Sequence, residues 1–161
     1  MITVTDLIES LETNLYIIRA QTQGLTHADS LLQLPFRGNC LNWVVGHIAD
    51  NRNTMLHVLG EEGILSEAQA ARYGFGSEPV CGDAADILPL EELLAMLEQS
   101  QKTLVARLQT IPAEDLARDV QSWLGTTTLG RLVVYLYWHE SYHTGQTEFL
   151  RQLAGKDDKV I

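Results

Sequence analysis

The sequence has little cysteine, little proline and no clustered positive charge. Its two cysteines, Cys40 and Cys81, are isolated and form no CxxC pair, which argues against a disulfide framework or a Cys-rich zinc site. A single Cys40–Cys81 disulfide is the alternative to two reduced thiols, which are the favoured interpretation for an intracellular protein. Only four prolines interrupt the 161 residues, so long segments are free to be helical.

Charge and hydropathy exclude several classes of partner. The 21 acidic residues outnumber the 11 Lys and Arg, and the formal net charge is −10. Because nucleic-acid binding relies on clustered Lys and Arg, we expect no nucleic-acid partner. Residues 1–10 lack a basic region before an apolar run, so we expect no signal peptide, and no uncharged apolar run is long enough for a membrane span. These features predict a cytoplasmic protein with no membrane partner.

Heptad spacing of apolar residues dominates what is present. With 45% hydrophobic residues, the chain is predicted to form one domain over residues 1–161 with a core of its own. The spacing predicts four long amphipathic helices, over about residues 3–24, 39–59, 89–111 and 127–154. Residues 60–89 hold five glycines and two prolines and predict a long crossover, and no strand-like alternation is visible. The predicted fold class is all-α, a four-helix bundle with a long crossover connection between helices 2 and 3.

The last predicted helix has an apolar seam with a polar centre. Leucines occupy both ends of the seam, and its middle consists of His139, His143 and Gln146. Residues four apart lie on one helix face one turn apart, so the two imidazoles suit a divalent transition metal. Gln146, one turn beyond His143, is a candidate to orient that ligand. The alternative is a pair of core histidines, each with its own hydrogen-bond partners.

Residues His139 to His143 also read H-E-x-x-H, the helix motif of zinc metalloproteases in which the glutamate is the general base. The extended form of the motif is missing, because Gly145 follows His143 too closely and no further histidine follows. No strand-rich subdomain is predicted that would build a substrate cleft, so a protease is disfavoured. Glu140 lies about 100° around the helix from His139 and is either a proton acceptor or a surface carboxylate.

A third metal ligand must come from another part of the chain. His27 belongs to a polar connection and is expected to be exposed, and His57 lies near a helix C-terminus, where the macrodipole favours it without any ligand. His47 alone lies by helical phase at the edge of a buried stripe, on the second helix. The predicted metal ligands are therefore His47, His139 and His143, which leave a position for water or substrate, as in a catalytic site.

Two motifs carry a resemblance to a known family. W-x-x-G-H at Trp43 to His47 and H-x-x-x-H-x-G-Q at His139 to Gln146 resemble the DinB/YfiT superfamily of metal-binding four-helix bundles. This is the damage-inducible family and not the similarly named DNA polymerase. The resemblance covers almost the whole chain and implies nickel or zinc bound by the three histidines, and in many members a homodimer. Thr144 stands where many relatives have a basic residue, so an anion contact from that position is not expected here.

The resemblance also implies classes of reaction. Characterised relatives include thiol-cofactor S-transferases and a thiol-dependent isomerase, and hydrolases have been proposed. We therefore predict a metal-dependent enzyme of the thiol S-transferase or hydrolase type, with a small-molecule substrate and a low-molecular-weight thiol as a candidate co-substrate. A bound metal would lower the pKa of that thiol or of a water. The alternative is a non-catalytic metal-binding module of a stress response. The sequence assigns no catalytic residue, and three imidazoles suit several metals alike.

Overall fold

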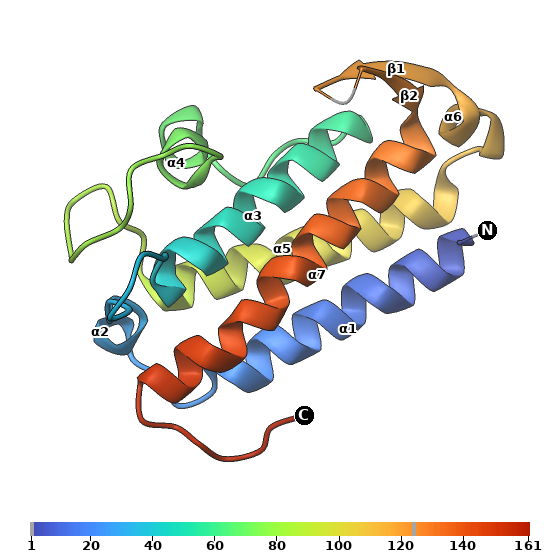
Figure 1. The fold of residues 1–161 in the computed structure, drawn as a ribbon. Coiled ribbons are helices and arrows are strands. Elements are labelled where there is room, and N and C mark those ends of the chain that lie inside the picture. The colour runs from blue at the N-terminus through green and yellow to red at the C-terminus, as the bar shows by residue number, and fades with distance from the viewer. Residues whose placement is uncertain (1, 124) are drawn as a thin grey trace.

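The computed structural model describes residues 2–123 and 125–161 and is mostly helical (Figure 1), which confirms the all-α prediction. The four long helices match the predicted ones to within a few residues, and they are α1 (Val4–Thr22), α3 (Leu41–Val58), α5 (Leu90–Thr110) and α7 (Leu129–Leu153). The short helices are α2 (His27–Ser30), α4 (Glu67–Tyr73) and α6 (Ala113–Ala117). No described helix is both long and apolar enough to cross a membrane.

Local chemistry sets the ends of the long helices. The Thr3 side chain accepts the backbone N–H of Asp6, and the Asp6 carboxylate accepts the N–H of Thr3, so the two residues form a capping box at the start of α1. Helix α5 begins directly after Pro89. Helix α3 ends before Gly60, whose φ of +84° lies in the left-handed region that glycine adopts without a steric penalty.

The four long helices pack side by side, and α1 and α3 each contact both α5 and α7. Two apolar clusters fill the space between them. One cluster contains Ile18, Ile48 and Leu97. The other contains Leu11 and lies nearer the opposite end of the four helices. Each long helix therefore contributes to both apolar clusters. Buried polar residues lie along the helices between the two clusters.

A polar layer of four buried residues separates the two clusters: Asn14 from α1, Arg52 from α3, Gln101 from α5 and Glu140 from α7. Arg52 contacts every other long helix. Its guanidinium donates to both carboxylate oxygens of Glu140, to the Gln101 side chain and to the carbonyl oxygen of Leu11. Asn14 donates to Glu140 over 3.3 Å. Since a buried charge is costly unless its hydrogen-bonding groups are paired, this full set of partners is what allows the ion pair to lie in the core.

The structure differs from the prediction between α6 and α7. Strands β1 (Asp119–Ser122) and β2 (Gly125–Thr128) form an antiparallel hairpin where the sequence showed no strand-like pattern. Four-residue strands are too short for a period of two to stand out, although the three threonines of β2 favour extended backbone. Thr128, the last residue of β2, caps α7 by accepting the N–H of Arg131.

The connection from α3 to α5 is fastened to the helices by one tyrosine. Tyr73, at the end of α4, is fully buried, and its hydroxyl donates to Asn42 and accepts the backbone N–H of Leu88. This contact fixes the middle of the connection beside the N-terminal half of α3, which carries His47. Both cysteines are free in this fold, with Cys40 buried and Cys81 exposed.

Candidate metal centre

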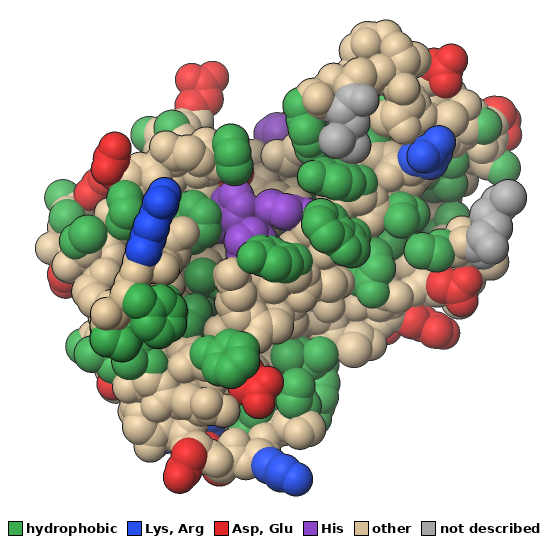
Figure 2. Space-filling view, in the orientation of Figure 1, with side chains coloured by type: hydrophobic (Ala, Val, Ile, Leu, Met, Phe, Trp, Pro, Cys, Tyr) green, Lys and Arg blue, Asp and Glu red, His purple; other side chains and the backbone are tan. Residues whose placement is uncertain are grey.

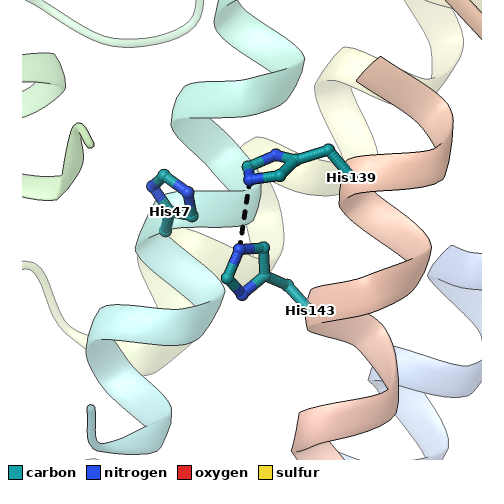
Figure 3. A group of neighbouring side chains, drawn as sticks. All are labelled: His47, His139 and His143. Atoms are coloured by element: carbon teal, nitrogen blue, oxygen red, sulfur yellow. Dashed lines mark hydrogen bonds between the residues drawn. The ribbon is translucent and has the colours of Figure 1, made fainter. Parts of the chain in front are cut away.

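Three histidines meet between α3 and α7 (Figure 3). His47 comes from α3, and His139 and His143 come from consecutive turns of α7. Their candidate ligand nitrogens all lie within 4.8 Å of one another, and the Nε2 atoms of His139 and His143 are 3.2 Å apart. The His47 ring stands at 82° to both other rings, with centroid distances of 5.1 and 4.7 Å. The structure thus brings together the three residues that the sequence selected.

The backbone orients the His47 ring. Its Nδ1 lies 2.7 Å from the carbonyl oxygen of Tyr73. A carbonyl oxygen only accepts hydrogen bonds, so Nδ1 carries the proton and the Nε2 lone pair is free for a metal. Sequence reasoning did not find this contact, because a backbone carbonyl 26 residues away has no signature of its own.

Side-chain amides orient the other two rings. His139 Nδ1 lies 3.2 Å from Oδ1 of Asn51, and His143 Nδ1 lies 2.9 Å from Oε1 of Gln146. Asn51 donates through Nδ2 to the carbonyl oxygen of Leu136, which leaves its Oδ1 to accept from His139. The contact of Gln146 is the one anticipated from its position one turn after His143. Asn51 is one turn after His47 on the same face of α3, and its role was missed.

A divalent cation fits this donor set. Each Nδ1 atom lies within hydrogen-bond distance of an oxygen acceptor. When all three donate there, three Nε2 lone pairs converge, and those of His139 and His143 face each other over 3.2 Å. Two facing lone pairs repel each other unless a positive charge lies between or beside them. Burial lowers the pKa of all three imidazoles, that of His143 to about 4, so the rings are neutral near pH 7, as metal ligands must be.

Two residues of the W-x-x-G-H motif support His47. The Trp43 ring stacks on the His47 ring, with centroids 4.6 Å apart and planes at 16°, and its Nε1 donates to the Ser77 hydroxyl. A Cβ atom at Gly46 would collide with the ring of Tyr73. Glycine is therefore needed at position 46 for Tyr73 to pack against α3 and for its carbonyl to reach His47.

Residues 8–147 match the family model of the DinB superfamily. The chain belongs to the DinB superfamily. Among solved structures, it is similar to a conserved protein from Enterococcus faecalis, with a TM-score of 0.73 and 18% sequence identity over 97% of this chain and 99% of that one. At this identity the likeness concerns the fold alone. No curated protein matches the chain.

In this DinB-superfamily protein the glutamate of H-E-x-x-H belongs to the core. Glu140 is 0% exposed, so the expectation of a surface carboxylate is wrong. Arg52 donates to both of its carboxylate oxygens, at 2.8 and 2.9 Å, and Asn14 also donates to one of them. Both carboxylate oxygens are occupied by these donors inside the core, so the group is not placed to accept a proton at the histidines. The metalloprotease role therefore has no support in the geometry.

The two remaining histidines lie outside the cluster. His57 is exposed, as predicted. His27 was expected to be exposed but is half-buried, because its Nδ1 accepts the backbone N–H of Leu90 at the first turn of α5. One of the orphan donors of that helix is thereby satisfied. The ring also lies 3.6 Å from Asp83, so His27 links α2 to the start of α5 and to the segment that precedes it.

The three-histidine cluster opens into a pocket of about 670 Å³. Figure 2 shows histidine side chains in a hollow of the surface with hydrophobic side chains around them. The ligand-bearing faces of α3 and α7 form its floor. Aromatic side chains from α7 and from two connections form its walls: Phe36, Phe75, Trp138, Tyr142 and Phe149. The cluster can therefore be reached by a small molecule from one side, which distinguishes it from a closed structural metal site.

Proposed function

We propose that this protein binds one divalent transition metal ion through the Nε2 atoms of His47, His139 and His143 and acts on a small molecule bound in the adjoining pocket. The observation that carries the proposal is that all three Nδ1 atoms are directed at oxygen acceptors, which leaves three lone pairs converging on one point. Zinc and nickel both suit three imidazoles. The scaffold that we infer is a four-helix bundle with the crossover between α3 and α5.

The chain's own residues hold and orient the ligands. Tyr73, Asn51 and Gln146 set the tautomers, which also raises the basicity of the ligating nitrogens. Trp43 covers one face of His47 and shields it from water. When bound, the metal would lower the pKa of a coordinated thiol or water and so supply a nucleophile at neutral pH.

The pocket favours thiol transfer over hydrolysis. No aspartate or glutamate is found among the described residues that line it, and its only histidines are the three candidate ligands. Hydrolysis requires a group that takes a proton from water and returns it to a leaving group. A thiol with a pKa near 8.5 loses its proton to solvent more readily once that pKa is lowered. We therefore place a thiol S-transferase first and a hydrolase second.

Non-catalytic metal binding, as part of a stress response, is the alternative function. It is favoured by the same lack of a free carboxylate in the pocket lining. The two functions are separated by incubating metal-loaded protein with a low-molecular-weight thiol and a panel of small electrophiles. An enzyme consumes thiol faster than the uncatalysed reaction, and the His47→Ala variant does not. A rate equal to the uncatalysed one across the panel supports the binding module.

Metal analysis tests the first step. The protein is purified without a His tag, loaded with zinc or nickel, passed over a desalting column and measured by inductively coupled plasma mass spectrometry. We expect about one ion per chain, and a loss of that ion in the His139→Ala and His143→Ala variants, because two imidazoles hold a metal far less tightly than three. His57→Ala is the matched control, since His57 is exposed and outside the cluster. Unchanged metal content in both cluster variants would contradict the proposal.

A further inference from the structure

Five exposed aromatic side chains in the described part of the chain gather at one place. Phe36, Phe75, Trp138, Tyr142 and Phe149 are all largely exposed, Phe75 to 98%, and all line the pocket beside the histidines. They come from α7 and from two separate connections. Single exposed apolar side chains scattered over a surface are normal. Several of them on one concave surface indicate a binding site.

Trp138 and Tyr142 form an aromatic wall along α7 that ends beside His143, a candidate metal ligand. The Trp138 and Tyr142 rings are nearly parallel, with centroids 6.5 Å apart and planes at 29°. Tyr142 then meets the His143 ring edge-on at 5.0 Å. Trp138 and Tyr142 are 57% and 59% exposed, so their rings offer area to a ligand. A flat apolar body fits such a wall, since aromatic pairs favour offset-stacked and edge-to-face contacts.

The charge of the pocket lining favours an anionic organic ligand over a cationic one. Arg37, in the connection from α2 to α3, is exposed and lines the pocket. It makes no ion pair or hydrogen bond with any other described residue. The described lining contains no acidic residue, although the chain as a whole carries a net charge of −10. A guanidinium with its donors free presents the fork that binds a carboxylate through two parallel hydrogen bonds.

We propose that the pocket binds a small carboxylate with an aromatic body. The flat body lies against Trp138 and Tyr142, and the carboxylate pairs with Arg37. What happens to the ligand at the histidines rests on the proposed function, but its binding needs only the aromatic wall and the arginine. The volume of about 670 Å³ is within the range of small-molecule sites.

The test uses the full chain freed of metal with EDTA and two probes of the same shape, 2-naphthoate and its neutral amide, 2-naphthamide. Isothermal titration calorimetry should show one naphthoate per chain, with a Kd on the order of 0.1 mM as expected for a ligand of this size, and about tenfold weaker amide binding. Arg37→Gln should weaken naphthoate about tenfold and leave amide binding unchanged. The control is Arg131→Gln. Arg131 is exposed on α7, and this substitution should change the binding of neither probe.

The aromatic wall is tested by a matched pair of tyrosines. Tyr142→Ala should weaken both probes about fivefold, whereas Tyr16→Ala, at an equally exposed tyrosine on α1, should weaken neither. The proposal is overturned if neither probe binds, if Arg37→Gln weakens both probes equally, or if Tyr142→Ala leaves both unchanged. It is also overturned if sedimentation shows a dimer that Tyr142→Ala dissociates, because the wall then contacts a second copy.

These measurements separate this inference from the metal proposal. The probes are titrated into metal-free protein, so their binding does not depend on the histidines as ligands. Probe binding with no metal retained on reloading would contradict the proposed function alone. One retained metal ion with no probe binding would contradict the ligand class alone.

Discussion

Arg52 donates one hydrogen bond to each carboxylate oxygen of Glu140, over 2.9 and 2.8 Å, and both side chains are completely buried. The residues that precede them in the chain are also paired, because Asn51 accepts from His139. Two consecutive residues of α3 thus contact two consecutive residues of α7. This double contact fixes the register of the two helices that carry the three histidines, so the polar layer supports the geometry of the histidine cluster.

Removing the Glu140 carboxylate should strongly destabilise the fold. In Glu140→Ala the Arg52 guanidinium would stay buried without its counter-charge, and we expect a loss of about 3–5 kcal/mol in the free energy of unfolding, measured by urea titration. Glu148→Ala is the control on the same helix. Glu148 is exposed and should change stability by less than about 0.5 kcal/mol. A loss under about 1 kcal/mol for Glu140→Ala would contradict the account of the polar layer.

Two glycine substitutions should have opposite effects. Gly46→Ala places a methyl group against the buried Tyr73 ring, and we expect a loss of about 1–3 kcal/mol together with weaker metal retention, since Tyr73 orients His47. Gly145→Ala meets nothing within 4 Å in the middle of α7 and should stabilise the protein by about 0.5–1 kcal/mol. Thermal unfolding and metal content check both. Equal effects of the two substitutions would show that Tyr73 does not need the space at position 46.

His143 should make the metal-free protein less stable in mild acid. Its pKa is about 4 in the folded state because burial disfavours its charged form, against 6.5 for an ordinary histidine. Between these values the unfolded state binds a proton that the folded state does not, so stability falls as the pH drops from 6.5 towards 4. From pH 6.5 to pH 5 we expect His143 to contribute about 2 kcal/mol to this fall. Urea titrations should show a shallower pH dependence in His143→Gln and an unchanged one in His57→Ala. An unchanged dependence in His143→Gln would contradict the burial of a neutral ring.

Asp50 should lower the stability of the fold at neutral pH and not in acid, which is the opposite pH dependence to that of His143. Burial raises the pKa of its carboxyl group from 3.8 to about 6, and the carboxylate makes no hydrogen bond with the rest of the described chain. The folded state therefore holds a proton that the unfolded state loses between pH 3.8 and 6, and the charged form costs stability at higher pH. Asp50→Asn should gain about 1–2 kcal/mol at pH 7.5, and the gain should vanish near pH 4. An equal gain at both pH values would show that charge is not its cause.

Much of the helical framework could be predicted from local signals. Heptad spacing located the long helices to within a few residues of their observed ends. Helical phase also selected His47, because a histidine at the edge of a buried stripe needs a polar partner in the core. These signals are local or periodic, so one sequence suffices to detect them.

The residues that support the three-histidine cluster depend on contacts between distant segments. Arg52 carries a charge that hydropathy assigns to solvent, and its burial is explained by partners far away in the chain, among them Glu140 on α7, 88 residues away. The Tyr73 carbonyl and the short β-hairpin likewise have no periodic signal. For the same reason, the alternatives for Glu140 were limited to proton acceptor and surface carboxylate, and neither describes a residue that is paired inside the core.

X-ray absorption spectroscopy at the metal edge tests the central claim most directly. In untagged protein loaded with zinc, we expect the scattering of three imidazole nitrogens at about 2.0–2.1 Å, and of two in the His47→Ala variant if any metal is retained. The same spectrum in wild type and His47→Ala would contradict the claim that α3 and α7 together hold one metal ion.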